Sequence, residues 1–204
     1  MNTKYIASPN FSSRDGERIL GVCVHITDAT TRSVISHFTN PASKVSAHYL
    51  VTRQGDIIQF VEESKVAWHA GYKVRPTAKL VLDRIELNPN SYLIGIEHEC
   101  LSNQDLTEIQ YVNSAKLLSE ICKRWSIPLS REFILRHHEI RADKTCPGIV
   151  SVEKLINLTF DPPQISEISE LQIKISLLQK ILELLKAITF YKKLGSNDDC
   201  ELSQ

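Results

Sequence analysis

The sequence lacks an apolar segment long enough to cross a membrane, and its start lacks the apolar core of a secretory signal. No stretch of about 18 consecutive apolar residues, the length that a spanning helix needs, occurs in the 204 residues. Residues 1–18 are instead rich in Asn, Thr, Ser, Pro and Lys. We therefore expect a protein that is cytoplasmic when it is synthesised.

The chain also lacks an excess of charge of either sign. Lys and Arg together number 24, and so do Asp and Glu. Proteins that bind nucleic acid present a basic surface to the phosphates. We expect no nucleic-acid partner.

Cysteines are few and odd in number, which argues against a disulfide framework. There are five, and without an export signal they are expected to be thiols or metal ligands. Cys146 is the one placed to bind a metal. For Cys23, Cys100 and Cys122 we expect small buried hydrophobic side chains.

Potential zinc ligands are concentrated between Arg136 and Gly148, a turn-rich segment that holds two histidines, a lysine and a cysteine. Nitrogen and thiolate ligands suit zinc, and a catalytic zinc site has three protein ligands and one open position. The segment could supply two of them. His25 is the obvious third, because the apolar run from Gly21 to Thr27 predicts a buried strand that would hold it rigidly.

The patterns predict one domain and an appendage. We expect a polar N-terminal segment (1–16), a folded domain (17–160), a boundary at the prolines near 162, a helical tail (164–194) and a disordered C-terminus (195–204). Within the domain, strands are expected at 17–26, 45–51, 57–61 and 91–99, and helices at 28–38, 107–125 and 151–158. Residues 71–90 are expected to form a long loop with a short helix near 80–85. The fold class is α/β, a mixed central sheet flanked by helices.

The tail has the spacing of a coiled-coil seam. Successive apolar residues of this seam are separated by three or four positions: Ile168, Leu171, Ile175, Leu178, Leu182 and Leu185. Four further apolar residues widen the seam: Ile173, Leu177, Ile181 and Leu184. We predict an amphipathic helix that forms homo-oligomers. A helix folded back on its own domain and a membrane-surface helix are the alternatives.

Ordered motifs connect the chain to a known family. These are the strand ending in His25, Val45-Ser-Ala-His-Tyr-Leu-Val51 with its following turn, Trp68-His-Ala-Gly71, Ile94-Gly-Ile-Glu97, and the segment from His137 to Gly148. Over residues 17–160 the chain resembles the zinc-dependent N-acetylmuramoyl-L-alanine amidases, whose domain is shared by phage amidase lysozymes and peptidoglycan recognition proteins. The resemblance implies Zn²⁺ held by His25, His137 and Cys146, with His138 pointing away and Glu139 as a partner of a ligand imidazole.

The resemblance also implies catalytic roles. Glu97 matches the glutamate that handles the proton, with Glu99 as the alternative two residues further along. Lys144 matches the lysine that stabilises the developing oxyanion.

Three residues are expected to bind substrate. His69 matches a histidine of the cleft, Trp68 offers an apolar platform, and His48 is expected to face the cleft from its strand.

The implied activity is hydrolysis of the amide between N-acetylmuramic acid and L-alanine in peptidoglycan or muropeptides. Either an endolysin, released to the cell wall at lysis, or a cytosolic recycling enzyme fits. A peptidoglycan-binding module without turnover is one alternative. A structural zinc protein is another, which would need a fourth ligand such as Cys23.

Overall fold

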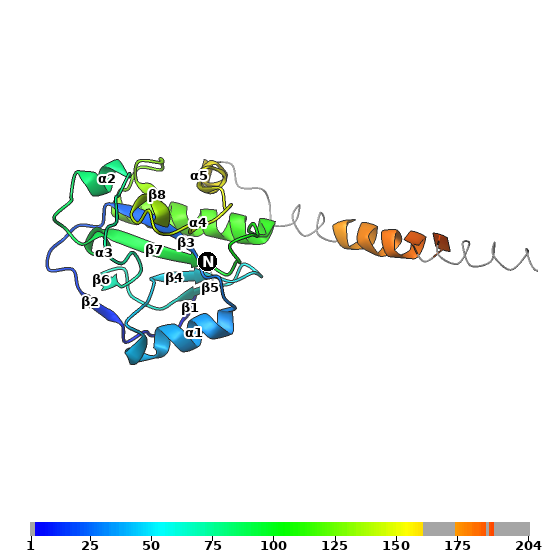
Figure 1. Ribbon diagram of the computed structural model, residues 1–204, viewed down its shortest axis with the longest axis horizontal. Helices are drawn as coiled ribbons and strands as arrows, with labels where there is room; N and C mark the ends of the chain where they lie inside the picture. Colours follow the sequence, from blue (N-terminus) through cyan, green and yellow to red (C-terminus); the bar gives the residue numbers. More distant parts are fainter. Residues whose placement is uncertain (1–2, 161–173, 187, 190–204) are drawn as a thin grey trace, which may run out of the picture. The chain divides into compact units, whose positions relative to one another are not determined.

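The computed structural model describes residues 3–160, 174–186 and 188–189 (Figure 1). The chain divides into two compact units, Met1–Pro162 and Pro163–Gln204. In the second unit, residues 174–186 and 188–189 are helical. None of the helices in these described ranges is long and apolar enough to span a membrane.

The first unit is built on a six-stranded mixed sheet, as the sequence predicted. Its order is β1 (Thr3–Tyr5), β5 (Ile57–Gln59), β4 (Tyr49–Val51), β7 (Leu93–His98), β3 (Gly21–Ile26) and β8 (Ile134–Arg136). Only β4 and β5 pair antiparallel within it; the other neighbours are parallel. A separate antiparallel pair joins β2 (Phe11–Ser13) to β6 (Lys65–Ala67).

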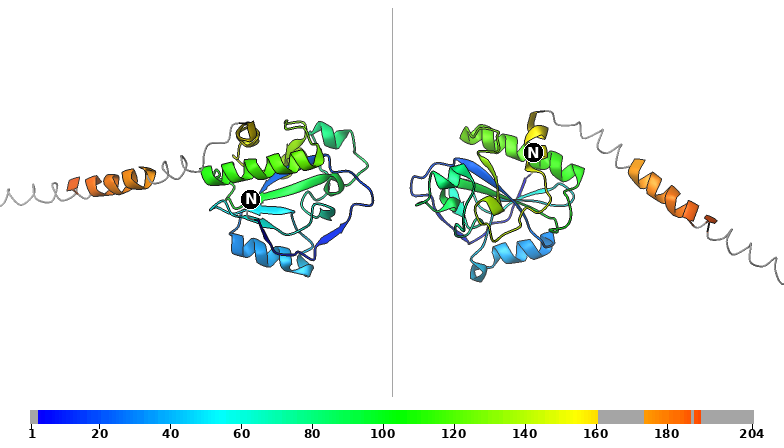
Figure 2. Two further views of the ribbon diagram at one scale, coloured as in Figure 1. Left: turned by 180° about the vertical axis from the view of Figure 1, so that it is seen from behind. Right: turned by 45° about the horizontal axis from the view of Figure 1, so that its top comes forward.

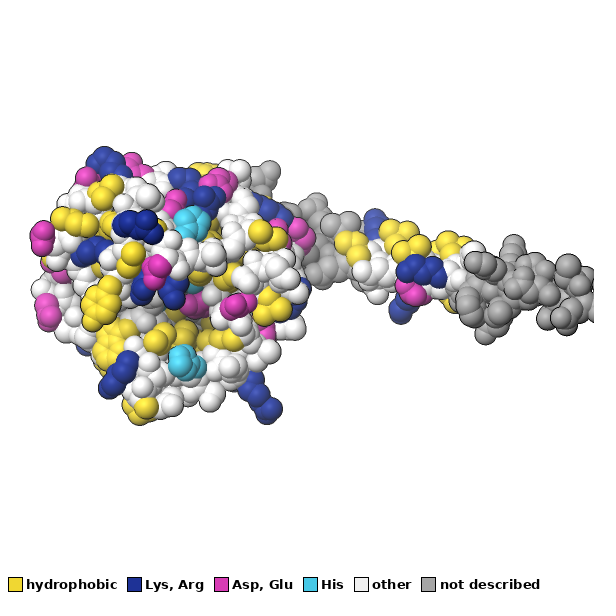
Figure 3. All heavy atoms as spheres, in the orientation of Figure 1, with side chains coloured by type: hydrophobic (Ala, Val, Ile, Leu, Met, Phe, Trp, Pro, Cys, Tyr) yellow, Lys and Arg dark blue, Asp and Glu magenta, His cyan; other side chains and the backbone are white. Residues whose placement is uncertain are grey.

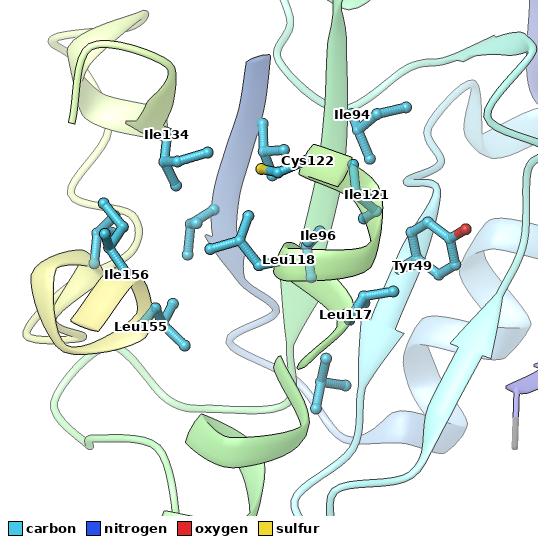
Figure 4. Packing of buried hydrophobic residues seen from close by; sticks show 14 of the residues in the cluster. Tyr49, Ile94, Ile96, Leu117, Leu118, Ile121, Cys122, Ile134, Leu155 and Ile156 are labelled. Carbon is cyan, nitrogen blue, oxygen red and sulfur yellow. The ribbon is translucent and has the colours of Figure 1, made fainter. Parts of the chain in front are cut away.

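One face of the sheet is covered by α4 (Glu108–Trp125) and α5 (Val152–Phe160), and α1 (Thr31–Thr39) lies on the opposite side (Figures 1 and 2). Ile94 and Ile96 of β7 pack with Leu118 and Ile121 of α4 in the largest buried cluster (Figure 4). Because side chains alternate along a strand, Glu97 and the glycine at 95 belong to the opposite face.

That opposite face is covered in two separate patches. α1 packs over one of them, where Val34 and Phe38 join Leu50 of β4. The other lies under α2 (Lys79–Leu82) and α3 (Pro89–Tyr92), where Leu80 joins Cys23 of β3. His25 of β3 and Glu97 of β7 lie on this same face, whereas His98 of β7 faces α4, where its Nε2 is 2.7 Å from Ser114 Oγ.

Several local predictions are confirmed. The helix predicted over 107–125 is α4, and Thr107 and Gln110 form a capping box at its start. The turn of the β4–β5 hairpin has Gly55 at φ +84°, a conformation that favours glycine. Cys23, Cys100 and Cys122 are buried free thiols.

Other elements differ from the predictions. The N-terminal segment forms β1 and β2, and neither β6 nor β8 was expected. Each has three residues, too few for a periodic pattern to be recognised. The predicted disordered C-terminus and the first part of the predicted seam lie outside the described residues.

A buried carboxylate ties the hairpin to the end of α4. Glu63 accepts hydrogen bonds from Tyr49 Oη at 2.7 Å, from Arg124 Nε and Nη2 at 2.8 and 2.9 Å, and from the Trp125 indole. Burial alone would raise the pKa of Glu63, but these hydrogen bonds and the Arg124 charge lower it below its ordinary value.

We expect Glu63→Gln to lower the free energy of unfolding by about 1–3 kcal/mol, because an amide cannot accept all of these hydrogen bonds. A depressed carboxyl pKa contributes stability above the pKa of the unfolded chain, and this contribution is lost as the pH falls through the folded value. The wild-type advantage should therefore shrink in urea titrations below a pH of about 4. The matched control is Glu62→Gln at an exposed neighbour. Equal stability of the two variants at pH 7 would contradict the role of Glu63.

Candidate metal centre and active site

The site is organised on two adjacent parallel strands. His25 of β3 is in register with Glu97 of β7, and neighbouring strands are separated by only about 5 Å. Both side chains lie on the face that α4 leaves free. β8, on the other side of β3, leads directly into the short helix η2 (His137–Glu139), which brings His137 to the same end of the sheet.

Three potential metal ligands converge there. The ligand atoms of His25, His137 and Cys146 all lie within 4.8 Å of one another. The Cys146 Sγ is 3.9 Å from the His25 Nδ1, and the centroids of the two imidazole rings are 4.4 Å apart. These are the three residues that the family motifs indicated.

In both His25 and His137, the Nε2 atom already contacts another residue, so Nδ1 is the ring nitrogen that faces the cluster. His137 Nε2 lies 3.1 Å from the carbonyl oxygen of Ala70. Because a carbonyl oxygen can only accept a hydrogen bond, Nε2 carries the proton of the neutral ring, and Nδ1 carries none. His25 Nε2 lies 3.0 Å from His69 Nδ1, so its Nδ1 is the nitrogen that faces Cys146. Contacts of this kind fix the tautomer and ring orientation of metal-binding histidines.

The lowered pKa values of the two imidazoles favour the neutral form that binds a metal. Burial, followed by the charge of His137, lowers the pKa of His25 well below its ordinary value. Burial also lowers the pKa of His137 to about 4. Both rings are therefore neutral near pH 7, the form that binds a metal. Burial raises the pKa of the Cys146 thiol to about 12, and a bound cation would favour its thiolate.

His69 supports His25 and does not face open solvent. It is 8% exposed, and its ring lies directly over Gly95, where an added Cβ would be 2.5 Å from the His69 Cγ. The glycine in Ile94-Gly-Ile-Glu97 thus makes room for this ring. Asn90 was not singled out from the sequence, yet its Oδ1 accepts from the amides of His69 and Ala70 at 3.1 and 2.8 Å. No local pattern distinguishes it from any other loop asparagine.

Glu97 and Glu99 differ sharply in their surroundings. Glu99 accepts three hydrogen bonds of 2.8 Å, two from Thr31 and one from the Arg53 amide. Burial alone would raise the pKa of Glu99, but these bonds lower it. The buried Oε2 of Glu97 has no hydrogen-bond partner among the described residues, and burial raises its pKa to about 8. Of these two residues, Glu97 is the one with a side-chain oxygen that no described residue engages.

A small cavity opens beside Glu97. Its volume is about 220 Å³, and its lining includes Val34, His37 and Phe38 of α1 together with Val45. The face of the molecule seen in Figure 3 is hollowed near its middle. The space could hold one side chain or a small part of a larger ligand.

The remaining predicted site residues have varied surroundings. Lys144 is exposed, and its charge acts on His137 and Cys146. Trp68 is half-buried and donates to Ser12 Oγ at 3.2 Å. Substrate contacts by Trp68 and His69 stay predictions.

His48 does not face the cleft. It is fully buried, with the Gly95 amide 3.0 Å from its Nδ1 and both Arg14 Nη2 and the Lys65 carbonyl near its Nε2. The expected contact between His48 and a substrate therefore finds no support in its position, because the two neighbouring strands and Arg14 surround the ring.

In the His137–Gly148 segment, the prediction for His138 agrees with the structure and the prediction for Glu139 does not. His138 points away from the cluster, with its Nδ1 3.2 Å from the carbonyl of Cys146. The prediction that Glu139 supports a ligand imidazole is wrong. Its carboxylate accepts from Arg131 and from the Arg136 amide, both at 2.6 Å, and so closes the turn of η2.

Cys23 was the suggested fourth ligand of a structural site. It forms a separate donor group with His25 and His69 and is not a member of the group that holds His137 and Cys146. Among the residues that the structure describes, the latter group has three members, the number found in catalytic zinc sites.

Comparisons with known proteins agree with this geometry. The family model described as N-acetylmuramoyl-L-alanine amidase matches residues 15–149. The chain is 34% identical over 121 residues to N-acetylmuramoyl-L-alanine amidase A of Achromobacter lyticus, covering 58% of this chain and 59% of that protein. It is 33% identical over 109 residues to the 1,6-anhydro-N-acetylmuramyl-L-alanine amidase AmpD of Escherichia coli, covering 52% of each. The chain thus spans only half to three fifths of these relatives.

Solved structures show the same fold. A selenomethionine derivative of AmpD superposes with a TM-score of 0.62 at 24% identity, covering 76% of this chain and 93% of that one. The amidase AmiD of E. coli, in complex with the substrate anhydro-N-acetylmuramic acid-L-Ala-D-gamma-Glu-L-Lys, superposes with a TM-score of 0.53 at 25% identity, covering 68% and 61%. With the motifs, the sheet and the family match over residues 15–149 in agreement, the chain belongs to the N-acetylmuramoyl-L-alanine amidase family.

Proposed function

We propose that the protein is a zinc-dependent amidase that hydrolyses the bond between N-acetylmuramic acid and L-alanine. One observation carries the proposal: the converging donors His25, His137 and Cys146 lie on the same sheet face as Glu97, whose buried Oε2 has no hydrogen-bond partner in the described part of the chain. An unpartnered buried carboxylate costs stability, so its presence beside a metal-binding cluster favours catalysis over binding alone.

The donor set fits zinc. Two neutral imidazoles and one thiol suit a borderline-soft ion, and three protein ligands leave one position open. Zinc held by these residues would polarise the scissile carbonyl and lower the pKa of a bound water.

Glu97 is proposed to move the proton. Hydrolysis of an amide requires that a proton leave the attacking water and reach the departing nitrogen. A carboxyl whose pKa is about 8 can hold a proton and release it near neutral pH. The register of Glu97 with His25 supports this proposal, because it sets the two residues side by side on adjacent strands.

Lys144 is proposed to stabilise the oxyanion that develops on the scissile carbonyl. Its charge acts on both His137 and Cys146, so its ammonium group belongs to the same electrostatic environment. Placing a positive charge where negative charge develops lowers the barrier.

Muropeptides or polymeric peptidoglycan are the proposed substrates. AmiD was solved with a soluble anhydro-muropeptide, and AmpD is named as a 1,6-anhydro-N-acetylmuramyl-L-alanine amidase. An enzyme of this kind could recycle soluble fragments or degrade the wall at lysis, and comparing the two substrates separates these roles.

The proposed activity predicts release of intact stem peptide from a muramyl peptide, detected by mass spectrometry. Release should stop after chelation and return with stoichiometric zinc, because the ligand cluster is required. Parallel reactions with an anhydro-muropeptide and with intact sacculi measure the preference. Zinc-loaded protein that releases peptide from neither substrate would contradict the proposed function.

We expect Glu97→Gln to retain one zinc per chain and to lower kcat by about 10²–10⁴-fold, because the amide cannot exchange the proton. Zinc content by elemental analysis and peptide release are measured on the same sample. Glu99→Gln is the matched control and should keep turnover within a few-fold while it lowers the melting temperature. A larger loss of turnover in the control than in Glu97→Gln would move the catalytic role to Glu99.

The packing of His69 on Gly95 predicts an indirect effect on the metal. Gly95→Ala should displace the His69 ring and its contact with His25, and so weaken zinc binding by about 10–100-fold. His69→Ala should do the same, and the double variant should lose no more than either alone. Zinc affinity is measured by competition with a chromophoric chelator. If the losses of zinc affinity in the two single variants add up in the double variant, the methyl group that Gly95→Ala introduces does not act through His69.

A further inference from the structure

The helix of the second unit exposes two rows of aliphatic side chains. The first row is Ile175, Leu178, Leu182 and Leu185, and the second is Leu177, Ile181, Leu184 and Ile188. All eight are between 45% and 64% exposed. Their apolar atoms gather along one side of the helix in Figure 3. This is far more exposed aliphatic surface than an isolated helix of this length would ordinarily carry.

Each row repeats at the spacing that a neighbouring helix requires. Successive members are separated by three, four and three residues in the first row and by four, three and four in the second. Alternation of three and four is the seam of a helix packed alongside another helix. A helix with one partner needs one such seam, and this helix carries two.

The two rows point in different directions. At about 100° per residue, their centres lie roughly 110° apart around the helix axis. A single partner helix can cover one row only, because a coiled-coil seam is narrow. Each helix must therefore have two neighbours for both rows to be buried.

We propose that the tails of four or more copies of this chain assemble into a closed parallel ring of helices. The first row of each helix packs on the second row of the next, a head-to-tail contact that closes under cyclic symmetry. The angle between the rows is close to the interior angle of a regular ring of four or five, about 90° to 108°.

The charges favour this occupant over a membrane surface. Lys180 and Glu183 lie on the arc opposite the rows, whereas Lys186 lies at the edge of this arc beside Ile175 and Lys174 lies between the rows. Glu183 accepts from Lys186 at 3.0 Å. Helices that lie on anionic membranes present a consistently basic polar face, whereas this arc carries both signs. In a ring this polar arc would face solvent, where side chains of either charge are well hydrated.

The test measures the mass of the full-length chain at micromolar concentration by light scattering and native mass spectrometry. We expect a single assembly of at least four chains. Leu178→Lys breaks the first row and Leu184→Lys breaks the second, and each alone should abolish the ring because every contact uses both rows. Gln179→Lys, on the polar arc, is the matched control and should leave the mass unchanged.

Three outcomes would overturn the proposal. A wild-type dimer would mean that one row stays uncovered, and a wild-type monomer would mean that the tail does not self-associate. A monomer that sediments with vesicles of anionic phospholipid would assign the rows to a membrane surface. Activity on a soluble muropeptide is measured in parallel and should be equal in all variants, so the result is independent of the proposed amidase function.

Discussion

Coverage of one face of the sheet by α4 and α5 is the constraint on which the site depends. Val24 and Ile96 are buried beneath these helices, and alternation along β3 and β7 then places His25 and Glu97 on the opposite face. A slip of one residue in either strand would turn His25 or Glu97 toward α4 and an aliphatic residue toward the opposite face. The hydrophobic face therefore fixes the catalytic face.

The ligand cluster is held by contacts that leave its inner atoms free. Ala70 and His69 engage the outer ring nitrogens of His137 and His25, and Asn90 holds the loop that carries both supports. Rings that are oriented before a metal arrives lose little freedom when it binds. In the proposed site, His69 would act through its contact with His25, which is a positioning role.

Glu97 and Glu99 are two residues apart, but their surroundings give them different acid-base properties. Glu99 is saturated by hydrogen bonds and fastens the start of α1 to the hairpin turn. Glu97 is buried, and its Oε2 has no hydrogen-bond partner among the residues that the structure describes, a cost that proteins accept at functional sites. Opposite pKa shifts follow from these surroundings and not from the residue type.

The sequence by itself determined the mixed sheet, the capped helix α4, the family and the three residues of the ligand cluster, because long periodic segments and short motifs are local signals. It did not determine the short strands β1, β2, β6 and β8, whose pairing depends on distant partners. It could not place His48 in the interior, show how differently Glu97 and Glu99 are hydrogen-bonded, or detect the support that Asn90 gives. Those outcomes depend on hydrogen bonds between segments far apart in the chain, and only the tertiary structure decides which donors and acceptors meet.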